Sequence, residues 1–135
     1  MSVEDNIGTV QKIYEAFGTG DVEAILDCCT DDVDWASDSE IEIAPWHGVK
    51  HGKAETAAFF SAIAESGTVT EFTPLSFAGN DDGDVMAFLR YGVTLNATGK
   101  TVTTNLHHYW RLRDGKVYYY RGSEDTAAIA AGLTP

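Results

Sequence analysis

The spacing of apolar residues changes from a helical period to a strand period near residue 66, and this change most constrains the fold. Residues 3–17 place apolar side chains three and four positions apart, as an amphipathic helix does. Two further helices are predicted over residues 21–29 and 53–65. Beyond them apolar and polar residues alternate, which predicts four strands over residues 68–79, 84–99, 100–114 and 116–125.

Short turns that contain glycine separate the four predicted strands, in the stretches NDDGD, ATGK and RDGK. Turns this short join antiparallel neighbours, so the second half of the chain is predicted to be an antiparallel meander. Helices followed by such a sheet indicate an α+β fold, with N-terminal helices packed on a curved antiparallel sheet. A sheet bent around helices leaves a cone-shaped cavity, where small ligands bind. We expect residues 1–135 to form one domain of this kind.

The charge balance argues against several classes of partner. Lysine and arginine number 9 against 21 acidic residues, a net charge of −12, so no basic patch is expected for nucleic acid or an anionic membrane. The N-terminus has neither the basic nor the apolar region of a secretory signal. Cys28 and Cys29 are adjacent, a spacing that disfavours a disulfide between them and fits a reducing compartment. A cytoplasmic protein is therefore expected.

Three stretches of the chain resemble the SnoaL-like, ketosteroid-isomerase-related family of the NTF2-like superfamily. They are IYEAFGTGDVEAILDCCTDDVDW, PWHGVKHGKAETAAFFSAIAE and HHYWRLRDGKVYYYRGSEDTAAIAAGL, in the family's order over nearly the whole chain. The resemblance implies a cone-shaped NTF2-like (cystatin-like) barrel. It also implies a small hydrophobic carbonyl-type ligand, a homodimer and no cofactor. Isomerases, cyclases, epoxide hydrolases and non-catalytic binders share this fold, so the fold leaves the activity open.

The resemblance to steroid isomerases implies three catalytic positions. Tyr14 in YEAF matches the tyrosine of the first helix that holds the enolate oxygen. Asp38 lies one residue from the position of the general-base aspartate, and Ser37 occupies the strict register. His107 stands where those enzymes carry a protonated aspartate as a second oxyanion donor. Asp38 would then move a proton while Tyr14 and His107 hold the enolate oxygen.

The ligand pocket is expected to be lined by aromatic residues and one arginine, namely Phe17, Trp35, Trp46, Phe60, Arg90, Tyr109 and Tyr120. The epoxide hydrolases of the superfamily carry acids at two positions where this chain has Gly92 and Gly122, so epoxide hydrolysis is not expected. His47 and His51 flank Gly48 in a loop without a motif of acidic or cysteine ligands, so no metal site is predicted.

The register of the strand that contains residues 106–112 decides which histidine reaches the pocket. His107 and Tyr109 lie on one face of this strand, and His108, Trp110 and Leu112 lie on the other. In the family register His107 and Tyr109 face the cavity. The second face is then predicted to form a homodimer contact, because large exposed apolar patches mark interfaces. The opposite register exchanges the roles of the two histidines and stays open as the alternative.

Two functions follow as hypotheses. The first is a cofactor-independent acid/base enzyme, of the isomerase, cyclase or dehydratase type, that acts on a small apolar carbonyl compound. Tyr14 and Asp38 support this hypothesis. The second is a non-catalytic protein that binds a small hydrophobic ligand, which the missing acids at residues 92, 107 and 122 support.

Overall fold

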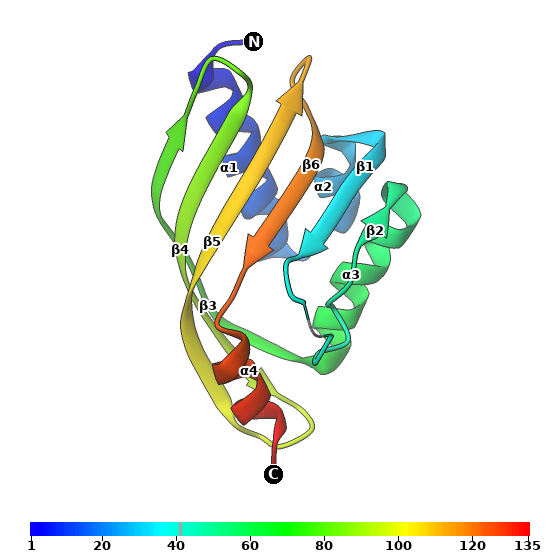
Figure 1. The fold of residues 1–135 in the computed structure, drawn as a ribbon, viewed down its shortest axis with the longest axis vertical. Coiled ribbons are helices and arrows are strands. Elements are labelled where there is room, and N and C mark those ends of the chain that lie inside the picture. The colour runs from blue at the N-terminus through cyan, green and yellow to red at the C-terminus, as the bar shows by residue number, and fades with distance from the viewer. Residues whose placement is uncertain (41) are drawn as a thin grey trace.

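The computed structural model describes residues 1–40 and 42–135, and it shows helices on one side of a curved mixed sheet (Figure 1). The helices are α1 (Val3–Thr19), α2 (Val22–Asp27), α3 (Gly52–Ser66) and α4 (Thr126–Leu133). The strands are β1 (Cys29–Ser37), β2 (Lys50–His51), β3 (Gly67–Gly79), β4 (Asp84–Leu95), β5 (Thr101–Arg113) and β6 (Lys116–Ser123). The predicted α+β class is confirmed.

The six strands lie in the order β2-β1-β6-β5-β4-β3. Strands β3 to β6 form the predicted antiparallel meander. Strand β1 adds a pairing that the sequence did not indicate, because it lies parallel to β6 although the two come from opposite ends of the chain. The short β2 then pairs antiparallel with β1 at one edge. The sheet stays open between its edge strands, and the helices complete the cone.

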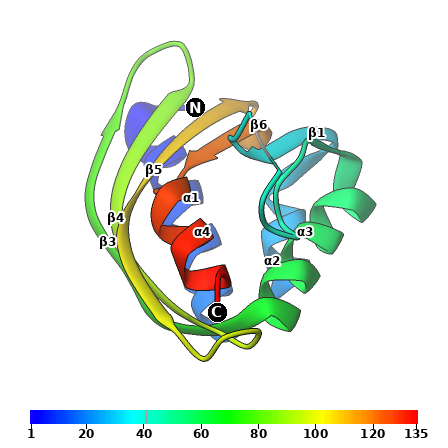
Figure 2. The same cartoon turned by 60° about the horizontal axis from the view of Figure 1, so that its bottom comes forward.

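The sheet curves around the N-terminal helices, and α4 lies at one end of the concave side (Figure 2). The core fills the space between the layers with side chains from every long strand and from α1 to α3. Trp35 of β1 and Trp110 of β5 are among its largest fully buried side chains. None of the described helices is long and apolar enough to cross a bilayer.

The ends of α1 show why the sequence places this helix where it lies. The Ser2 hydroxyl accepts the N–H of Asp5 and the Asp5 carboxylate accepts the N–H of Ser2, which is a complete capping box. At the other end Gly20 adopts a left-handed conformation with φ 73°, which glycine reaches without strain. The caps fix where α1 begins and ends. They therefore also fix the position along the helix at which Tyr14 contacts the sheet.

The favoured register of β5 was wrong, and the alternative is the correct one. His108, Trp110 and Leu112 point into the molecule, whereas His107 is exposed and Tyr109 lies on the outer face. The reason is the alternation within β5 itself, since its inward positions are mostly apolar and its outward positions mostly polar. Burying the apolar set inside the chain's own core gains the free energy of transfer without a partner.

The predicted homodimer residues were wrong for the same reason. Trp110 is 1% exposed and Leu112 is 5% exposed within one chain, so neither side chain is free to contact a second copy. His108 is likewise buried beneath the sheet. The homodimer itself stays a prediction, and any such contact would involve other residues.

Candidate functional site

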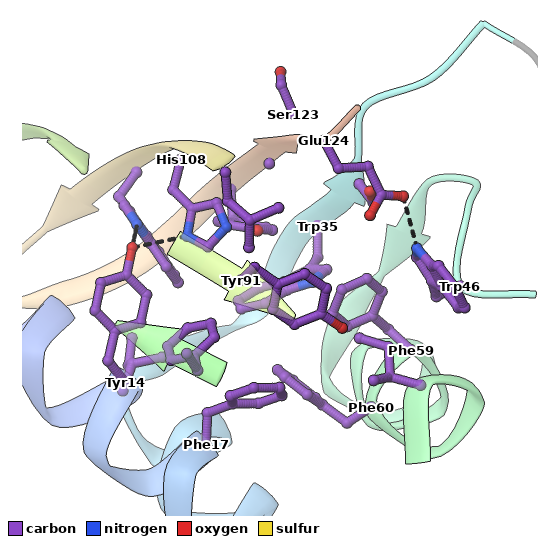
Figure 3. A pocket seen from close by; sticks show the side chains of 18 residues that line it. Tyr14, Phe17, Trp35, Trp46, Phe59, Phe60, Tyr91, His108, Ser123 and Glu124 are labelled. Carbon is purple, nitrogen blue, oxygen red and sulfur yellow. Dashed lines mark hydrogen bonds between the residues drawn. The ribbon is translucent and has the colours of Figure 1, made fainter. Parts of the chain in front are cut away.

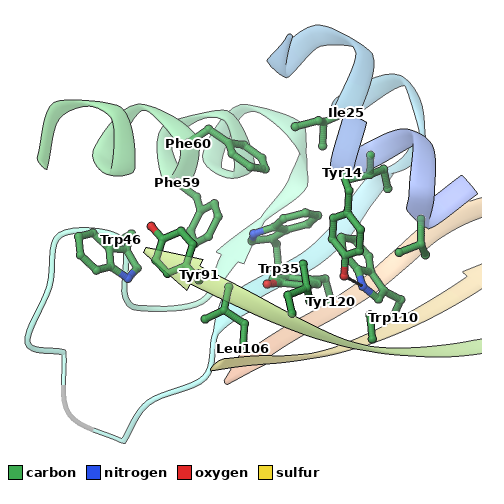
Figure 4. Close-up of a cluster of buried hydrophobic side chains, with 14 of the residues drawn as sticks. Tyr14, Ile25, Trp35, Trp46, Phe59, Phe60, Tyr91, Leu106, Trp110 and Tyr120 are labelled. Carbon is green, nitrogen blue, oxygen red and sulfur yellow. Dashed lines mark hydrogen bonds between the residues drawn. The ribbon is translucent and has the colours of Figure 1, made fainter. Parts of the chain in front are cut away.

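An aromatic cavity lies between the helices and the concave face of the sheet (Figures 3 and 4). Its walls are mainly rings from α1, α3 and the strands, and it encloses about 70 Å³. Several polar groups interrupt these walls, among them His108 from β5, Tyr91 from β4 and Glu124, which follows β6. A mostly apolar cavity with a few convergent polar groups is the usual form of a small-molecule site.

Tyr14, His108 and Trp110 form a hydrogen-bonded group at one end of the cavity. Trp110 Nε1 donates to the Tyr14 hydroxyl oxygen at 3.1 Å. The same hydroxyl lies 2.8 Å from His108 Nδ1. Because its oxygen already accepts from Trp110, we assign the Tyr14 proton to the bond with His108 Nδ1. The proton of the neutral imidazole then sits on Nε2, which has no hydrogen-bond partner among the described residues.

His108 is held in the neutral form. Burial lowers the pKa of His108 to about 3, with a smaller contribution from His107. Burial also raises the pKa of Tyr14, so the phenol keeps its proton. His108 Nε2–H is therefore a neutral donor that can stabilise an oxyanion without adding a positive charge to the cavity.

The buried imidazole predicts an acid-dependent loss of stability. The unfolded chain binds a proton at His108 below pH 6.5, but the folded chain does so only near pH 3. Stability is therefore lost as the pH falls through this window, by about 2 kcal/mol from this group between pH 6.5 and 5.

Urea unfolding of wild type and His108→Phe at pH 7 and pH 5 measures this contribution. The loss should be smaller in the variant by about that amount. His107→Gln is the matched control, because His107 is the exposed neighbour and its replacement should leave the loss in place. An equal loss in wild type and His108→Phe would contradict the assignment.

A carboxylate with two N–H donors occupies the other side of the cavity. Glu124 Oε1 accepts from Trp46 Nε1 at 2.9 Å and lies 2.6 Å from His47 Nε2 (Figure 3). The backbone N–H groups of Ile43 and Ala44 both donate to His47 Nδ1, so the proton of His47 sits on Nε2 and points at Glu124. The Glu124 side chain is only 7% exposed.

This arrangement leaves one carboxylate oxygen free for chemistry. Both N–H donors contact Oε1, and Oε2 of Glu124 has no hydrogen bond within residues 1–40 and 42–135. The carboxylate is fixed in orientation by Trp46 and His47, since two bonds to one oxygen prevent rotation. A fixed carboxylate with an unused oxygen facing an apolar cavity suits a general base.

Tyr91 adds a phenol to the same space. It is 6% exposed and lies on the cavity wall between the two polar ends. Burial, together with the nearby charge of Glu124, raises the pKa of the Tyr91 phenol, so this hydroxyl stays protonated. Its hydroxyl makes no hydrogen bond within the described part of the chain, which leaves it available to a ligand.

The model of the SnoaL-like domain matches residues 10–120. The chain belongs to the SnoaL-like family. No curated protein sequence matches this SnoaL-like chain.

Solved structures confirm the NTF2-like fold of this SnoaL-like protein. An NTF2-like protein of unknown function from Burkholderia pseudomallei is 26% identical with a TM-score of 0.89, and 100% of each chain is covered. TerC, co-crystallised with polyporic acid, is 26% identical with a TM-score of 0.85 over 96% of this chain and 98% of its own. A putative polyketide cyclase from Xanthomonas campestris is 21% identical with a TM-score of 0.80, over 98% of both chains.

Most residues predicted to line the pocket of the SnoaL-like domain do so. The cavity wall includes Phe17, Trp35, Trp46, Phe60 and Tyr120, and it also includes Tyr14, which was predicted as a catalytic residue. Two predictions were wrong, because Arg90 and Tyr109 lie on the outer face of the sheet. Arg90 donates to Asn105 there, and Tyr109 packs its ring at 6.1 Å from that of Tyr119.

The predicted catalytic residues Asp38 and His107 do not reach the cavity. Asp38 follows the end of β1 and is exposed, whereas the preceding Ser37 is buried and lines the cavity. Successive residues of an extended chain point to opposite sides. Ser37, and not Asp38, therefore occupies the inward position that the family alignment assigns to the aspartate. His107 is exposed on the outer face of β5, and His108 occupies the inward position.

Glu124, His47 and Tyr91 were missed as site residues of the SnoaL-like domain. Tyr91 could have been found, since Leu89, Tyr91 and Val93 alternate with outward residues along β4. His47 was considered only as a possible metal ligand, and no metal site was predicted there. Glu124 lies just beyond the last strand, and its contact with Trp46 and His47 joins segments that no local pattern connects.

The structure explains why Gly122 stands where related epoxide hydrolases carry an acidic residue. A Cβ atom at Gly122 would collide with the hydroxyl of Tyr120 on the same inward face of β6. The glycine therefore leaves room for the Tyr120 hydroxyl, where a larger residue would place its side chain. The next residues of the chain then bring Glu124 to the cavity from just past the strand end.

A partition of aromatic rings separates the cavity from a larger groove of about 520 Å³ beside α1, α2, α3 and β3. Phe17, Phe60, Ile63 and Phe72 line both spaces. Phe17 lies 4.7 Å from Phe72 and 6.0 Å from Phe60 between ring centroids. A volume of 70 Å³ is smaller than most ligand pockets, so a ring-sized ligand must displace part of this partition.

Phe17→Ala should therefore widen the site for larger ring-shaped molecules, for which two ketones serve as probes. Phe17 is half-buried, and its removal joins the cavity to the groove. We expect a three-ring ketone such as anthrone to bind at least tenfold more tightly, with little change for cyclohexenone. Titration calorimetry measures both affinities, with Phe88→Ala on the outer face as the control. An equal loss of affinity for both ketones would show that Phe17 contacts the ligand and does not block access to the groove.

Proposed function

We propose that this protein is a cofactor-independent acid/base enzyme that acts next to the carbonyl group of a small, largely apolar ketone. The observation that carries the proposal is the Glu124 carboxylate, held through Oε1 by Trp46 and His47 with Oε2 unused. The neutral donor His108 lines the same cavity. A base and an oxyanion donor around one apolar space are the two groups that enolisation requires.

The proposed first step forms an enolate. Glu124 Oε2 takes a proton from the carbon next to the carbonyl, and the C–H electron pair becomes a carbon–carbon double bond. The carbonyl π electrons move to oxygen, which then carries the negative charge. His108 Nε2–H donates to this oxygen while Tyr14 holds the imidazole in the required tautomer.

The second step decides the type of reaction. If protonated Glu124 returns its proton to a different carbon of the enolate, the product is an isomer. If the enolate carbon instead attacks a second carbonyl within the same molecule, the new alkoxide takes the proton back from Glu124 and the product is a ring that carries a hydroxyl group. Both outcomes use the same base and the same oxyanion donor, so both belong to the proposed class.

The comparisons support a small aromatic or polycyclic ligand. TerC, which is 26% identical over 96% of this chain, was crystallised with polyporic acid. The aromatic walls of the cavity in the present protein suit a flat ring, because ring edges and faces pack against each other at 4.5–7 Å. These features favour a flat ring ketone over an open aliphatic one.

Proton exchange in D₂O tests the proposal directly. Enolisable ring ketones such as 1-tetralone and steroid enones are incubated with the protein, and their α-proton signals are followed by NMR. The proposal expects loss of these signals at a rate proportional to enzyme concentration. Saturable line broadening without exchange would instead identify a protein that binds such ligands without acting on them.

A further inference from the structure

The indole N–H of Trp35 is a buried donor without a partner among the described residues. The Trp35 side chain is 2% exposed, and its indole N–H has no acceptor within residues 1–40 and 42–135. The other two tryptophans differ, since Trp46 donates to Glu124 and Trp110 donates to Tyr14. An unpaired buried donor lowers stability, and native proteins keep few of them.

The indole of Trp35 cannot turn to find another acceptor. Its ring lies 4.1 Å from that of Tyr120 between centroids, and 5.5 Å from those of Phe60 and Trp110. Phe59 packs edge-on at 5.7 Å, so an N–H directed at this ring would gain only a weak contact. The packing therefore fixes the donor in one direction on the cavity wall.

The donor atom itself is buried just beneath the cavity wall, so a ligand oxygen reaches it only when a neighbouring ring moves aside. In Figure 4 the nitrogen of Trp35 lies on the side of the indole that faces Phe59 and Tyr91. Trp35 and Tyr91 both line the cavity, and the Tyr91 hydroxyl is also without a partner in the part of the chain that is described. Two unused donors on one apolar wall match a ligand that brings its own oxygen.

His108 and Trp35 share a neighbour on the cavity wall. The Tyr120 ring lies 5.2 Å from the His108 ring and 4.1 Å from the Trp35 ring between centroids. In the proposal, the two donors meet two different oxygens of one fused ring system.

We propose that Trp35 Nε1–H binds a second oxygen of the substrate, and that the substrate is a flat ring ketone with a hydroxyl or carbonyl group on the edge opposite its reacting carbonyl. This inference rests on the proposed function for the place of the reacting carbonyl at His108. Trp35 takes no part in the proton transfer and selects among ketones through the oxygen that they carry.

A matched pair of ketones tests the proposal. 6-Hydroxy-1-tetralone and 1-tetralone share one skeleton and one enolisable carbonyl, and only the first has an oxygen on the far edge. We expect the hydroxylated ketone to bind the wild-type protein about threefold to tenfold more tightly, the effect of one neutral hydrogen bond. Trp35→Phe keeps an aromatic ring but removes the N–H, so it should abolish this difference.

Indole N–H signals give a readout that packing alone would not change. The chain has 3 tryptophans, so ¹⁵N-tryptophan labelling gives three indole signals, which single Trp→Phe variants assign. The Trp35 proton should move downfield with 6-hydroxy-1-tetralone and stay in place with 1-tetralone. Equal affinities in wild type, or a preference that survives in Trp35→Phe, would overturn the proposal.

The result separates this inference from the proposed function. If both ketones bind and exchange α-protons while the Trp35 signal never responds, the second-oxygen site is wrong and the acid/base activity stands. If the Trp35 signal responds to the hydroxylated ketone without any exchange, the oxygen site is supported and the activity is wrong.

Discussion

Glu124→Gln should lower the rate of α-proton exchange by a factor of about 10² to 10⁴, the range for losing a general base. Glutamine has nearly the same shape, and its amide oxygen still accepts from Trp46 and His47. The protein should therefore fold as before, with an unfolding midpoint close to that of wild type. What is lost is the basic oxygen, because an amide does not take up a proton near neutral pH.

Asp38→Asn is the control that separates the two candidates for the base. Asp38 is exposed and outside the aromatic cavity, so its replacement should leave exchange unchanged. The exchange rate of 1-tetralone by NMR, at equal protein concentrations, compares both variants with wild type. A collapse of the rate in Asp38→Asn with little change in Glu124→Gln would reverse the assignment.

His108→Phe should lower the exchange rate by a factor of about 10² to 10³, as the loss of one oxyanion donor does. Phenylalanine fills the same inward position of β5 and keeps the ring contact with Tyr120. It removes the Nε2 proton and leaves the Tyr14 hydroxyl without its acceptor. The effect should appear in kcat more than in KM, because the bond strengthens as charge develops on the oxygen.

Tyr14→Phe distinguishes the donor from the residue that positions it. This variant keeps the His108 ring but leaves Nδ1 of His108 and the N–H of Trp110 unpaired. We expect a smaller loss of rate than in His108→Phe, with a loss of unfolding free energy of about 1 to 3 kcal/mol. A larger loss of rate in Tyr14→Phe would make the phenol itself the oxyanion donor.

The helices and the meander could be predicted from sequence because local signals specify them. The apolar spacing of residues 3–17, the glycine at residue 20 and the turn before residue 116 each act over a few residues. In that turn Asp114 and Gly115 both have positive φ, 52° and 77°, which joins two antiparallel strands tightly. The pairing of β1 with β6 could not be predicted in this way, because no local pattern relates the two segments.

The site shows where a family register can mislead. Tyr14 was placed correctly because a single helix face decides its direction. The choice between His107 and His108 depended on counting along a strand, where an error of one residue reverses every side chain. The amphipathic pattern of β5 favoured the correct answer, yet it was interpreted as evidence for a dimer. The role of Glu124 could not be predicted, because its contacts with Trp46 and His47 join two loops that lie far apart in the sequence.

The parallel pairing of β1 with β6 has a consequence for synthesis on the ribosome. Strand β1 gains its long neighbour in the sheet only after β6 has been made. Until then the apolar faces of β1 and α1 are exposed on the nascent chain, a state that chaperones recognise. Tyr14, His108 and Glu124 come from α1, β5 and the segment after β6, so they meet only once that segment has been made. A nascent chain that stops short of β6 should therefore lack the assembled cavity.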